Sequence, residues 1–351
     1  MVNYLNAHRF AHSRLLLTVF VVFALFLTSG CGLFGAKKKI TVPQLLPGTE
    51  AGRDRLIYEL NRLSNVTTIH GKLDIQFEDT SFASFGIADQ YRQVDGDITL
   101  QRPGKIYLII QFLLVDIAQM TSDGEQFRVA VLKGDRYKRF LRGTNNAVYK
   151  KLDEVESATP ANNNQKNAEK ETVSALSNLR PQHLTDAFMI RPIDPNGPLV
   201  YAQSEFFLEE ADTRAGARKN ARVMRPYYVL DEFSQPSGGQ AKLTRRLWFD
   251  RVSGIRLARI QSFDEAGKLV TDVAYFNEKQ IGAGPTALLP SRIEITRPQD
   301  QYKLSIAYQD ASSVEVNRPG GFGPRAFVLE NKWGLPEVDL DATHKKVTAN
   351  K

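Results

Sequence analysis

The feature that most constrains the fold is an alternation of apolar and polar residues that begins at Gly71. Leu73, Ile75 and Phe77 alternate with charged or polar neighbours, a period of two that is typical of a strand with one buried face. The same alternation returns in further short segments, divided by turn-forming pairs such as the Asp-Gly at 123–124. Short connections between consecutive strands indicate antiparallel neighbours, so the sequence predicts a mainly β fold (α+β) with a few helices.

The predicted strands fall into two groups. The first comprises residues 71–78, 97–101, 106–112, 119–122, 127–132 and 137–142, and the second comprises 203–208, 227–232, 244–250, 255–263, 269–277, 291–296 and 302–308. One strand differs from the others, because residues 106–112 (IYLIIQF) are apolar on both faces. Either another element covers its second face, or the side chains there line a cavity.

An amphipathic helix is predicted ahead of the first strand. Leu56, Ile57, Leu60 and Leu63 recur at helical spacing, and Thr49 is a candidate N-cap. The apolar stripe of this helix should lie against the sheet.

A polar region separates the two groups of strands. Residues 144–171 are rich in Asn, Lys and Glu and contain few apolar residues, so we predict a polar, disordered surface insertion. A short helix should follow and should end or kink at Pro181, and a second brief amphipathic piece is predicted over 184–190.

The N-terminus predicts export to the cell envelope. Residues 15–27 are 13 apolar or near-apolar residues after a cationic start, too few to span a bilayer of ~30 Å, which is typical of a secretory signal peptide over residues 1–30. The segment Leu27-Thr-Ser-Gly-Cys31 resembles the lipobox of bacterial lipoproteins, which implies that Cys31 is lipidated. It is the only cysteine in the chain and cannot form an intramolecular disulfide. The alternative is a simple signal peptide beside a stray cysteine.

Composition describes an ordinary globular protein after this leader. Hydrophobic residues make up 42% and charged residues 24% of the chain, which excludes a disordered or membrane-spanning protein. Residues 31–48 mix glycine, proline and three consecutive lysines, and we predict a flexible tether there. Without residues 1–30, which carry two of the 46 Lys and Arg, the net charge is 44 − 39 = +5. This mild excess suits an anionic membrane surface or simply a solvated face, and we expect no nucleic-acid partner.

Catalytic motifs are missing from the sequence. Beyond the leader only His70, His183 and His344 remain, far apart and without the spacing of a metal site. The glycine-rich segment 319–324 lacks the lysine of a phosphate-binding loop. We therefore predict a binding protein rather than an enzyme, with no metal and no cofactor other than the covalent lipid on Cys31.

Several segments carry a resemblance to a known family. In the first half these are RPGKIYLIIQ and MTSDGEQFRVAV, and in the second RRLWFDRVSGIRLARIQSFDEAGKLVTDVAY and LLPSRIEIT. Together they resemble the LolA/LolB superfamily of periplasmic lipoprotein carriers and outer-membrane lipoprotein receptors, over about residues 56–142 and 243–317. The resemblance implies one domain over 49–330, and residues 331–351, which fall outside the resemblance, are predicted to form a tail. It also implies an incomplete antiparallel β-barrel or strongly curved sheet with covering helices.

The resemblance also implies a function. We expect a protein lipid-anchored at the outer membrane, facing the periplasm, that binds a lipid or the acyl chains of lipoproteins and assists their transfer or insertion. The expected lining of the hydrophobic cavity is Leu73, Ile75, Phe77, Tyr107, Leu108, Ile109 and Ile110. Two alternatives stay open: these side chains fill a solid core, or the protein is a sensory or scaffold lipoprotein that binds another envelope protein.

Overall fold

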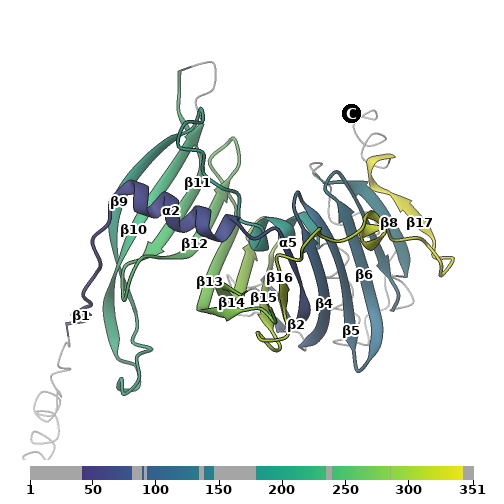
Figure 1. Cartoon of the computed structure of the whole chain (residues 1–351), viewed down its shortest axis with the longest axis horizontal. Coiled ribbons are helices and arrows are strands. Elements are labelled where there is room, and N and C mark those ends of the chain that lie inside the picture. Colours follow the sequence, from purple (N-terminus) through teal and green to yellow (C-terminus); the bar gives the residue numbers. More distant parts are fainter. Residues whose placement is uncertain are drawn as a thin grey trace, which may run out of the picture. The chain divides into compact units, whose positions relative to one another are not determined.

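The computed structural model describes residues 42–80, 89–90, 93–133, 138–145, 179–234, 239–284 and 286–342. The chain divides into two compact units, Met1–Gln44 and Leu45–Lys351, and the second holds nearly all of the described elements (Figure 1). The predicted signal peptide, Cys31 and most of the predicted polar insertion lie outside the described residues.

The second unit is built mainly from strands. Its helices are α2 (Arg53–Ser64), α5 (Pro181–Phe188) and the 3-10 turn η3 (Pro324–Phe327). The strands of the first group are β2 (Thr68–Asp79), β3 (Asp89–Gln90), β4 (Val94–Gln101), β5 (Lys105–Phe112), β6 (Val115–Asp123), β7 (Gln126–Val131) and β8 (Arg139–Thr144). Those of the second are β9 (Val200–Ala211), β10 (Arg222–Ser234), β11 (Lys242–Asp250), β12 (Arg256–Phe263), β13 (Leu269–Ile281), β14 (Ala287–Arg297) and β15 (Tyr302–Tyr308). Short strands complete the set: β1 (Gln44–Leu45), β16 (Glu315–Val316) and β17 (Glu337–Asp339).

Strand β2 joins the two groups into one sheet. Its residues 73–79 pair with β15, and its residues 68–75 pair with β4 on the other side. The pairings give the order β9-β10-β11-β12-β13-β14-β15-β2-β4-β5-β6-β7-β8-β17. All of these pairs are antiparallel except β8 with β17. The prediction of a mainly β, antiparallel fold is confirmed.

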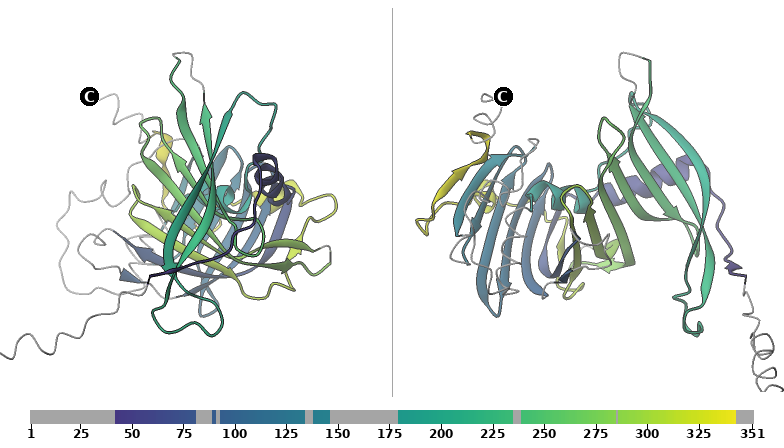
Figure 2. Two further views of the ribbon diagram at one scale, coloured as in Figure 1. Left: turned by 90° about the vertical axis from the view of Figure 1, so that its left-hand side faces the viewer. Right: turned by 180° about the vertical axis from the view of Figure 1, so that it is seen from behind.

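The predicted barrel-like curvature is not found. The described strands at the two ends of the order, β9 and β17, each pair with one neighbour, β10 and β8, and not with each other. The sheet therefore stays open, and it is neither closed nor strongly curled (Figures 1 and 2). Sequence periodicity specifies which side chains share a face, but it does not specify the twist and stagger that would close a barrel.

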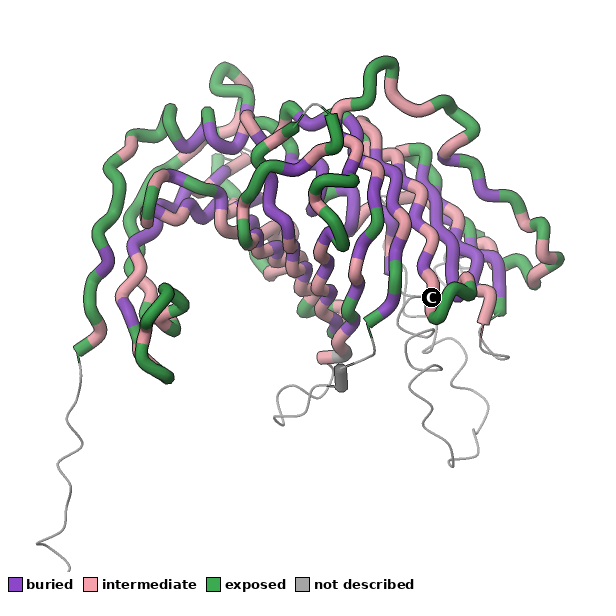
Figure 3. Tube along the Cα trace, turned by 60° about the horizontal axis from the view of Figure 1, so that its bottom comes forward, coloured by how far each residue is buried: buried purple, intermediate pink, exposed green. Residues whose placement is uncertain are grey.

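The two faces of the sheet differ in what covers them. We call the face that carries Leu73, Ile75 and Phe77 the inner face, and the opposite one the outer face. Buried and less buried residues alternate along the strands, as Figure 3 shows. The inner face belongs to the main hydrophobic core, together with apolar residues of α2 and α5. The side chains predicted for the buried stripe of α2 all lie in this core, and each contributes ~1.5–3 kcal/mol by its burial.

Both helices begin at residues other than those predicted. Helix α2 starts at Arg53 after Gly52, because the backbone N–H of Thr49 donates to Arg251 O and its carbonyl accepts from Arg251 Nε. Thr49 is therefore held in the loop and does not cap the helix. Pro181 opens α5, three residues before the predicted start at 184, since proline lacks only an N–H that the first turn does not use. The helix predicted ahead of Pro181 lies almost entirely outside the described residues.

The C-terminal segment covers part of the outer face. Leu329, Trp333 and Leu335 pack in one cluster with Tyr107, Ala130, Leu132 and Phe140. Strand β17 then pairs parallel with β8. Residues 331–342, which the sequence assigns to a tail, thus contribute a strand and apolar contacts to the second unit.

Candidate functional site

The side chains expected to bind a hydrophobic ligand divide between the two faces. Five of them lie on the inner face within the main core, each at most 4% exposed: Leu73, Ile75, Phe77, Leu108 and Ile110. Cross-strand pairing brings them together, because Leu73 and Ile110 both lie opposite Gly96 of β4. A Cβ at Gly96 would lie 2.7 Å from the end of the Ile75 side chain, so a larger residue there would require that side chain to move.

Tyr107 and Ile109 lie on the outer face, because successive residues of a strand point in opposite directions. The Tyr107 hydroxyl donates to Gln119 Oε1 at 2.9 Å, and its ring packs against the C-terminal cluster. This cluster is the cover that the apolar second face of β5 requires. Since Tyr107 and Ile109 are on the far side of the sheet, they cannot line one pocket with Leu108.

Helix α5 covers the inner face near the centre of the sheet (Figure 1). The buried Tyr275 hydroxyl donates to Ala187 O at 2.9 Å, and the Phe188 ring meets Tyr308 edge to face at 6.2 Å. Leu184 of the same helix is buried in the main core. The inner face is thus in apolar contact with a short helix of eight residues.

His183 of α5 and Tyr302 of β15 form a buried polar pair, and neither of them is charged. His183 Nδ1 and the Tyr302 hydroxyl are 2.5 Å apart. Burial, with Arg297 and Arg180 adding repulsion, keeps the pKa of His183 well below its usual range. Burial raises the pKa of Tyr302. Both groups are therefore neutral at pH 7.

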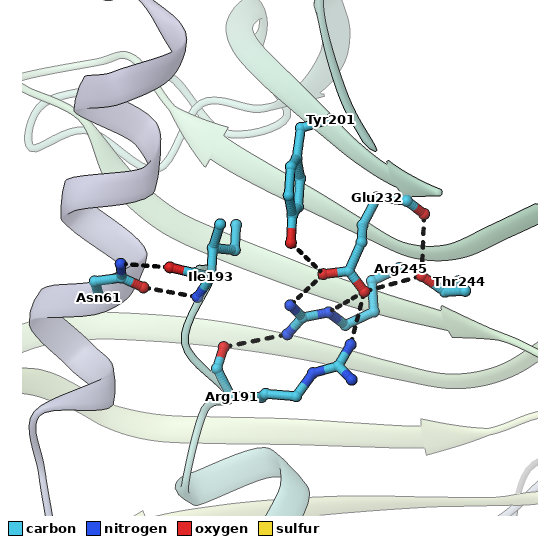
Figure 4. Close-up of polar contacts among 7 residues, drawn as sticks. All are labelled: Asn61, Arg191, Ile193, Tyr201, Glu232, Thr244 and Arg245. Atoms are coloured by element: carbon cyan, nitrogen blue, oxygen red, sulfur yellow. Dashed lines mark hydrogen bonds and ion pairs between the residues drawn. The ribbon is translucent and has the colours of Figure 1, made fainter. Parts of the chain in front are cut away.

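The residues that follow α5 form a strap, Met189–Ile193, which hydrogen bonds hold against its surroundings. The Arg102 guanidinium donates to Met189 O at 3.2 Å, to Ile190 O at 2.8 Å and to Val66 O at 2.7 Å. The Asn61 amide of α2 pairs with the backbone of Ile193, donating to its carbonyl and accepting from its N–H, both at 2.8 Å (Figure 4). The strap therefore links α2, α5 and the β4–β5 turn.

A buried carboxylate holds the middle of the strap. Glu232 of β10 is fully buried and accepts hydrogen bonds from Arg245, Arg191, Tyr201 and Thr244 (Figure 4). Arg245 also donates to Arg191 O at 3.2 Å. Burial opposes ionisation of Glu232, but the hydrogen bonds from Arg245 and Thr244 and the charges of Arg245 and Arg191 together outweigh it, and the pKa of Glu232 is lowered.

Sequence reasoning missed this cluster, although a signal was present. Along β10, Glu232 follows Tyr228 and Leu230 at the apolar spacing, and Arg245 precedes Leu247 and Phe249 in the same way on β11. An acid and a base at the inward positions of adjacent strands indicate a buried ion pair.

The hairpin between β5 and β6 ends in exposed leucines, a second feature that the sequence did not predict. Leu113 is 77% and Leu114 89% exposed, and Val115 after them is 47% exposed. Both leucines have left-handed φ values, 48° and 65°. Two-residue turns with both φ values positive strongly favour Asn-Gly. Leu113 and Leu114 thus combine an unfavourable backbone conformation with apolar side chains exposed to water.

Two other kinds of site find no support in the part of the chain that the structure describes. It contains no group of His, Cys, Asp or Glu residues that could hold a metal ion. None of its helices is long and apolar enough to cross a membrane.

Comparison with known proteins finds structural similarities only. No protein-family model and no curated protein match the chain. A DUF1329 family protein from Desulfovibrio piger matches with a TM-score of 0.38 and 12% identity, over 78% of this chain and 97% of that one. A LolA superfamily protein from Nitrosomonas europaea gives 0.37 and 10%, over 80% and 99%. A putative outer membrane lipoprotein-sorting protein domain from Vibrio parahaemolyticus gives 0.37 and 11%, over 78% and 94%. The LolA superfamily, which the sequence segments resemble, is therefore among the groups with which the chain has structural similarity.

Proposed function

We propose that this protein binds a lipid, or the acyl part of a lipoprotein, on its inner face and assists transfer or insertion at the outer membrane. The observation that carries the proposal is the path of β5. This strand contributes Leu108 and Ile110 to the inner face and ends at the exposed leucines 113 and 114. One strand therefore leads from a buried apolar face to an apolar tip in solvent.

Helix α5 is the element that an acyl chain would replace. The buried residues of the inner face contact α5 in this structure, so a ligand must take over the contacts of Leu184, Ala187 and Phe188. An acyl chain of ~14–16 methylenes gains ~0.8 kcal/mol for each one buried, or ~11–13 kcal/mol in all. This gross gain exceeds what the two large apolar side chains of α5, Leu184 and Phe188, contribute by burial, which is ~3–6 kcal/mol.

The exposed leucines would contact the membrane or the delivered acyl chain. We propose the double substitution Leu113→Asn with Leu114→Gly as the decisive test. Asn-Gly suits a turn with two positive φ values, so this variant should be as stable as the wild type or more so. It should bind a fluorescent fatty acid like the wild type and lose most of the transfer of a fluorescent lipopeptide to vesicles.

The matched control removes an apolar side chain elsewhere. Val328 is 50% exposed and lies after η3, so Val328→Asn should leave transfer unchanged. If the Asn-Gly variant transfers lipopeptide at the wild-type rate, the tip has no role in delivery. If the wild type binds no fatty acid, the ligand-binding face itself is wrongly assigned.

Lipid anchoring at Cys31 is a separate part of the proposal. Cys31 lies outside the described residues, and the support for its lipidation is the lipobox-like sequence alone. The expected result is incorporation of labelled palmitate by the wild type and none by Cys31→Ala. Labelling that persists in the variant, or fails in the wild type, would refute the anchor. We also propose, as a prediction, that the protein is not an enzyme.

The edge of the sheet supports a second candidate, a scaffold that binds an envelope protein. Strand β9 pairs with β10 along one edge, and no described strand pairs with its other edge. Val200, Phe206 and Phe207 on this strand are each more than 40% exposed. Exposed edges of this kind bind extended peptides by strand addition. Replacing Phe207 with a photo-crosslinking residue in cells would reveal such a partner. The lipid-transfer assays described above do not test this second candidate.

A further inference from the structure

The turn that joins β9 and β10 is basic at its tip. We call residues 212–221 (DTRAGARKNA) the basic tip; it contains Arg214, Arg218 and Lys219, and all three are exposed. β9 and β10 form a long hairpin at one end of the sheet (Figure 2). The charges of the basic tip therefore lie at the end of this hairpin, away from the rest of the sheet (Figure 2).

Two of the cations have no acidic partner. Asp212, the only acid of the basic tip, forms a salt bridge with Arg214 at 2.8 Å. Arg218 and Lys219 form no ion pair with any residue that the structure describes. Among the flanking residues, Glu209 pairs with Arg222 at 3.1 Å. The basic tip thus offers two free positive charges side by side.

The chain enters the second unit next to this tip. The backbone N–H of Leu46 donates to Met224 O at 2.9 Å, and Met224 lies two residues beyond Arg222, where β10 begins. Fourteen residues, 32–45, lie between Cys31 and Leu46, and the chain from Cys31 to Leu46 reaches at most about 50 Å when extended. A lipid on Cys31 would therefore keep the end of the hairpin that carries the basic tip within about this distance of the membrane surface.

These observations together point to a membrane-docking surface. We propose that the basic tip binds the anionic phosphate groups of phospholipid headgroups, with Arg218 and Lys219 as the residues that contact them. Arg and Lys are the usual donors to phosphate oxygens, and one such residue at an anionic membrane surface strengthens binding about fivefold. The inference depends on the proposed anchoring at Cys31 for the orientation of the tip. Lipidation and headgroup contact involve different residues, so they can be tested separately.

The test uses residues 42–351, which contain the whole compact second unit but neither Cys31 nor the lysines at 37–39. Partitioning would be measured onto phosphatidylcholine vesicles with and without phosphatidylglycerol. We expect binding to the anionic vesicles only, weakening as salt rises. Reversing both charges, Arg218→Glu with Lys219→Glu, should weaken it at least tenfold without a change in circular dichroism, because both side chains are in solvent.

The control reverses the same amount of charge elsewhere. Lys242, which pairs with Ser234 at the far end of β10, and Lys268 are also exposed, so Lys242→Glu with Lys268→Glu should keep most of the binding. Equal losses in the two variants would mean a general effect of net charge and overturn the proposal, as would equal binding to neutral vesicles. Tighter binding to heparin than to anionic vesicles would assign the tip to a soluble polyanion instead. None of these outcomes affects the palmitate test, so the anchor and the tip can fail separately.

Discussion

Removing the Glu232 carboxylate should be among the most damaging single changes in this protein. In Glu232→Ala, Arg245 keeps its charge in a side chain that is 9% exposed, and the Tyr201 hydroxyl loses its acceptor. Breaking a buried ion pair by removing one partner costs ~3–5 kcal/mol, because the remaining charge stays uncompensated. Arg191 adds little to this cost, since its side chain is 60% exposed and can turn into water.

Urea unfolding of residues 42–351 measures this cost directly. The companion variant replaces both members of the pair, Glu232→Met with Arg245→Met. Without a stranded charge it should recover most of the lost free energy of unfolding, as apolar replacements of buried ion pairs often do. A loss below ~1 kcal/mol in Glu232→Ala would show that water reaches Arg245, and a double variant less stable than the single one would contradict the argument.

The pH dependence gives an independent check. The pKa of Glu232 is lower in the folded protein than in the unfolded chain, so its ionised form stabilises the fold above the unfolded pKa of about 4.3. This contribution is lost as pH falls through the lower, folded pKa. The difference in unfolding free energy between the wild type and Glu232→Gln should therefore be constant above about pH 5 and shrink below about pH 4.

Four further results are expected. Leu108→Ala should lose ~2–5 kcal/mol in urea unfolding, because the side chain is 1% exposed, whereas Ile109→Ala on the outer face should lose less than ~1.5 kcal/mol. The free energy of unfolding of the wild type should fall as pH drops below about 6.5, because His183 then takes up a proton in the unfolded chain but stays neutral in the folded protein. His183→Gln should make the free energy of unfolding less dependent on pH in this range. Asn61→Ala should speed hydrogen exchange in the strap, and an unchanged rate at Ile193 would show that other contacts hold it. Deleting 154–170, which lies outside the described residues, should barely shift the melting temperature, and a large drop would mean that this segment packs.

Local sequence determined where the main strands lie, although β9 and β10 extend well beyond the predicted 203–208 and 227–232. The period of two placed Leu73, Ile75 and Phe77 on one face and predicted β15 with the bounds that the structure shows. It also separated Leu108 from Ile109, although it could not assign either residue to a side. These successes have one cause, since alternation of side chains along a strand depends only on backbone geometry.

The candidate site was predictable only in part. The five inner-face residues of the expected ligand set do lie together, but Tyr107 was grouped with them although it faces the C-terminal cluster. The exposed leucines at 113 and 114 lacked any turn signal, because leucine is rare at positive φ. Their place on a hairpin tip followed from the pairing of β5 with β6, not from their own preference.

Contacts between distant segments were decided by the tertiary structure alone. Leu304 pairs with Phe77 across 227 residues in the count 304 − 77, and this pairing joins the two groups of strands into one sheet. Glu232 and Arg245 occupy inward positions of their strands, but only the folded structure brings them together and places the strap over them. A sequence period shows which side chains share a face, but what covers that face depends on the packing of elements far apart in the chain, and that packing decides whether a charge, a helix or a ligand lies there.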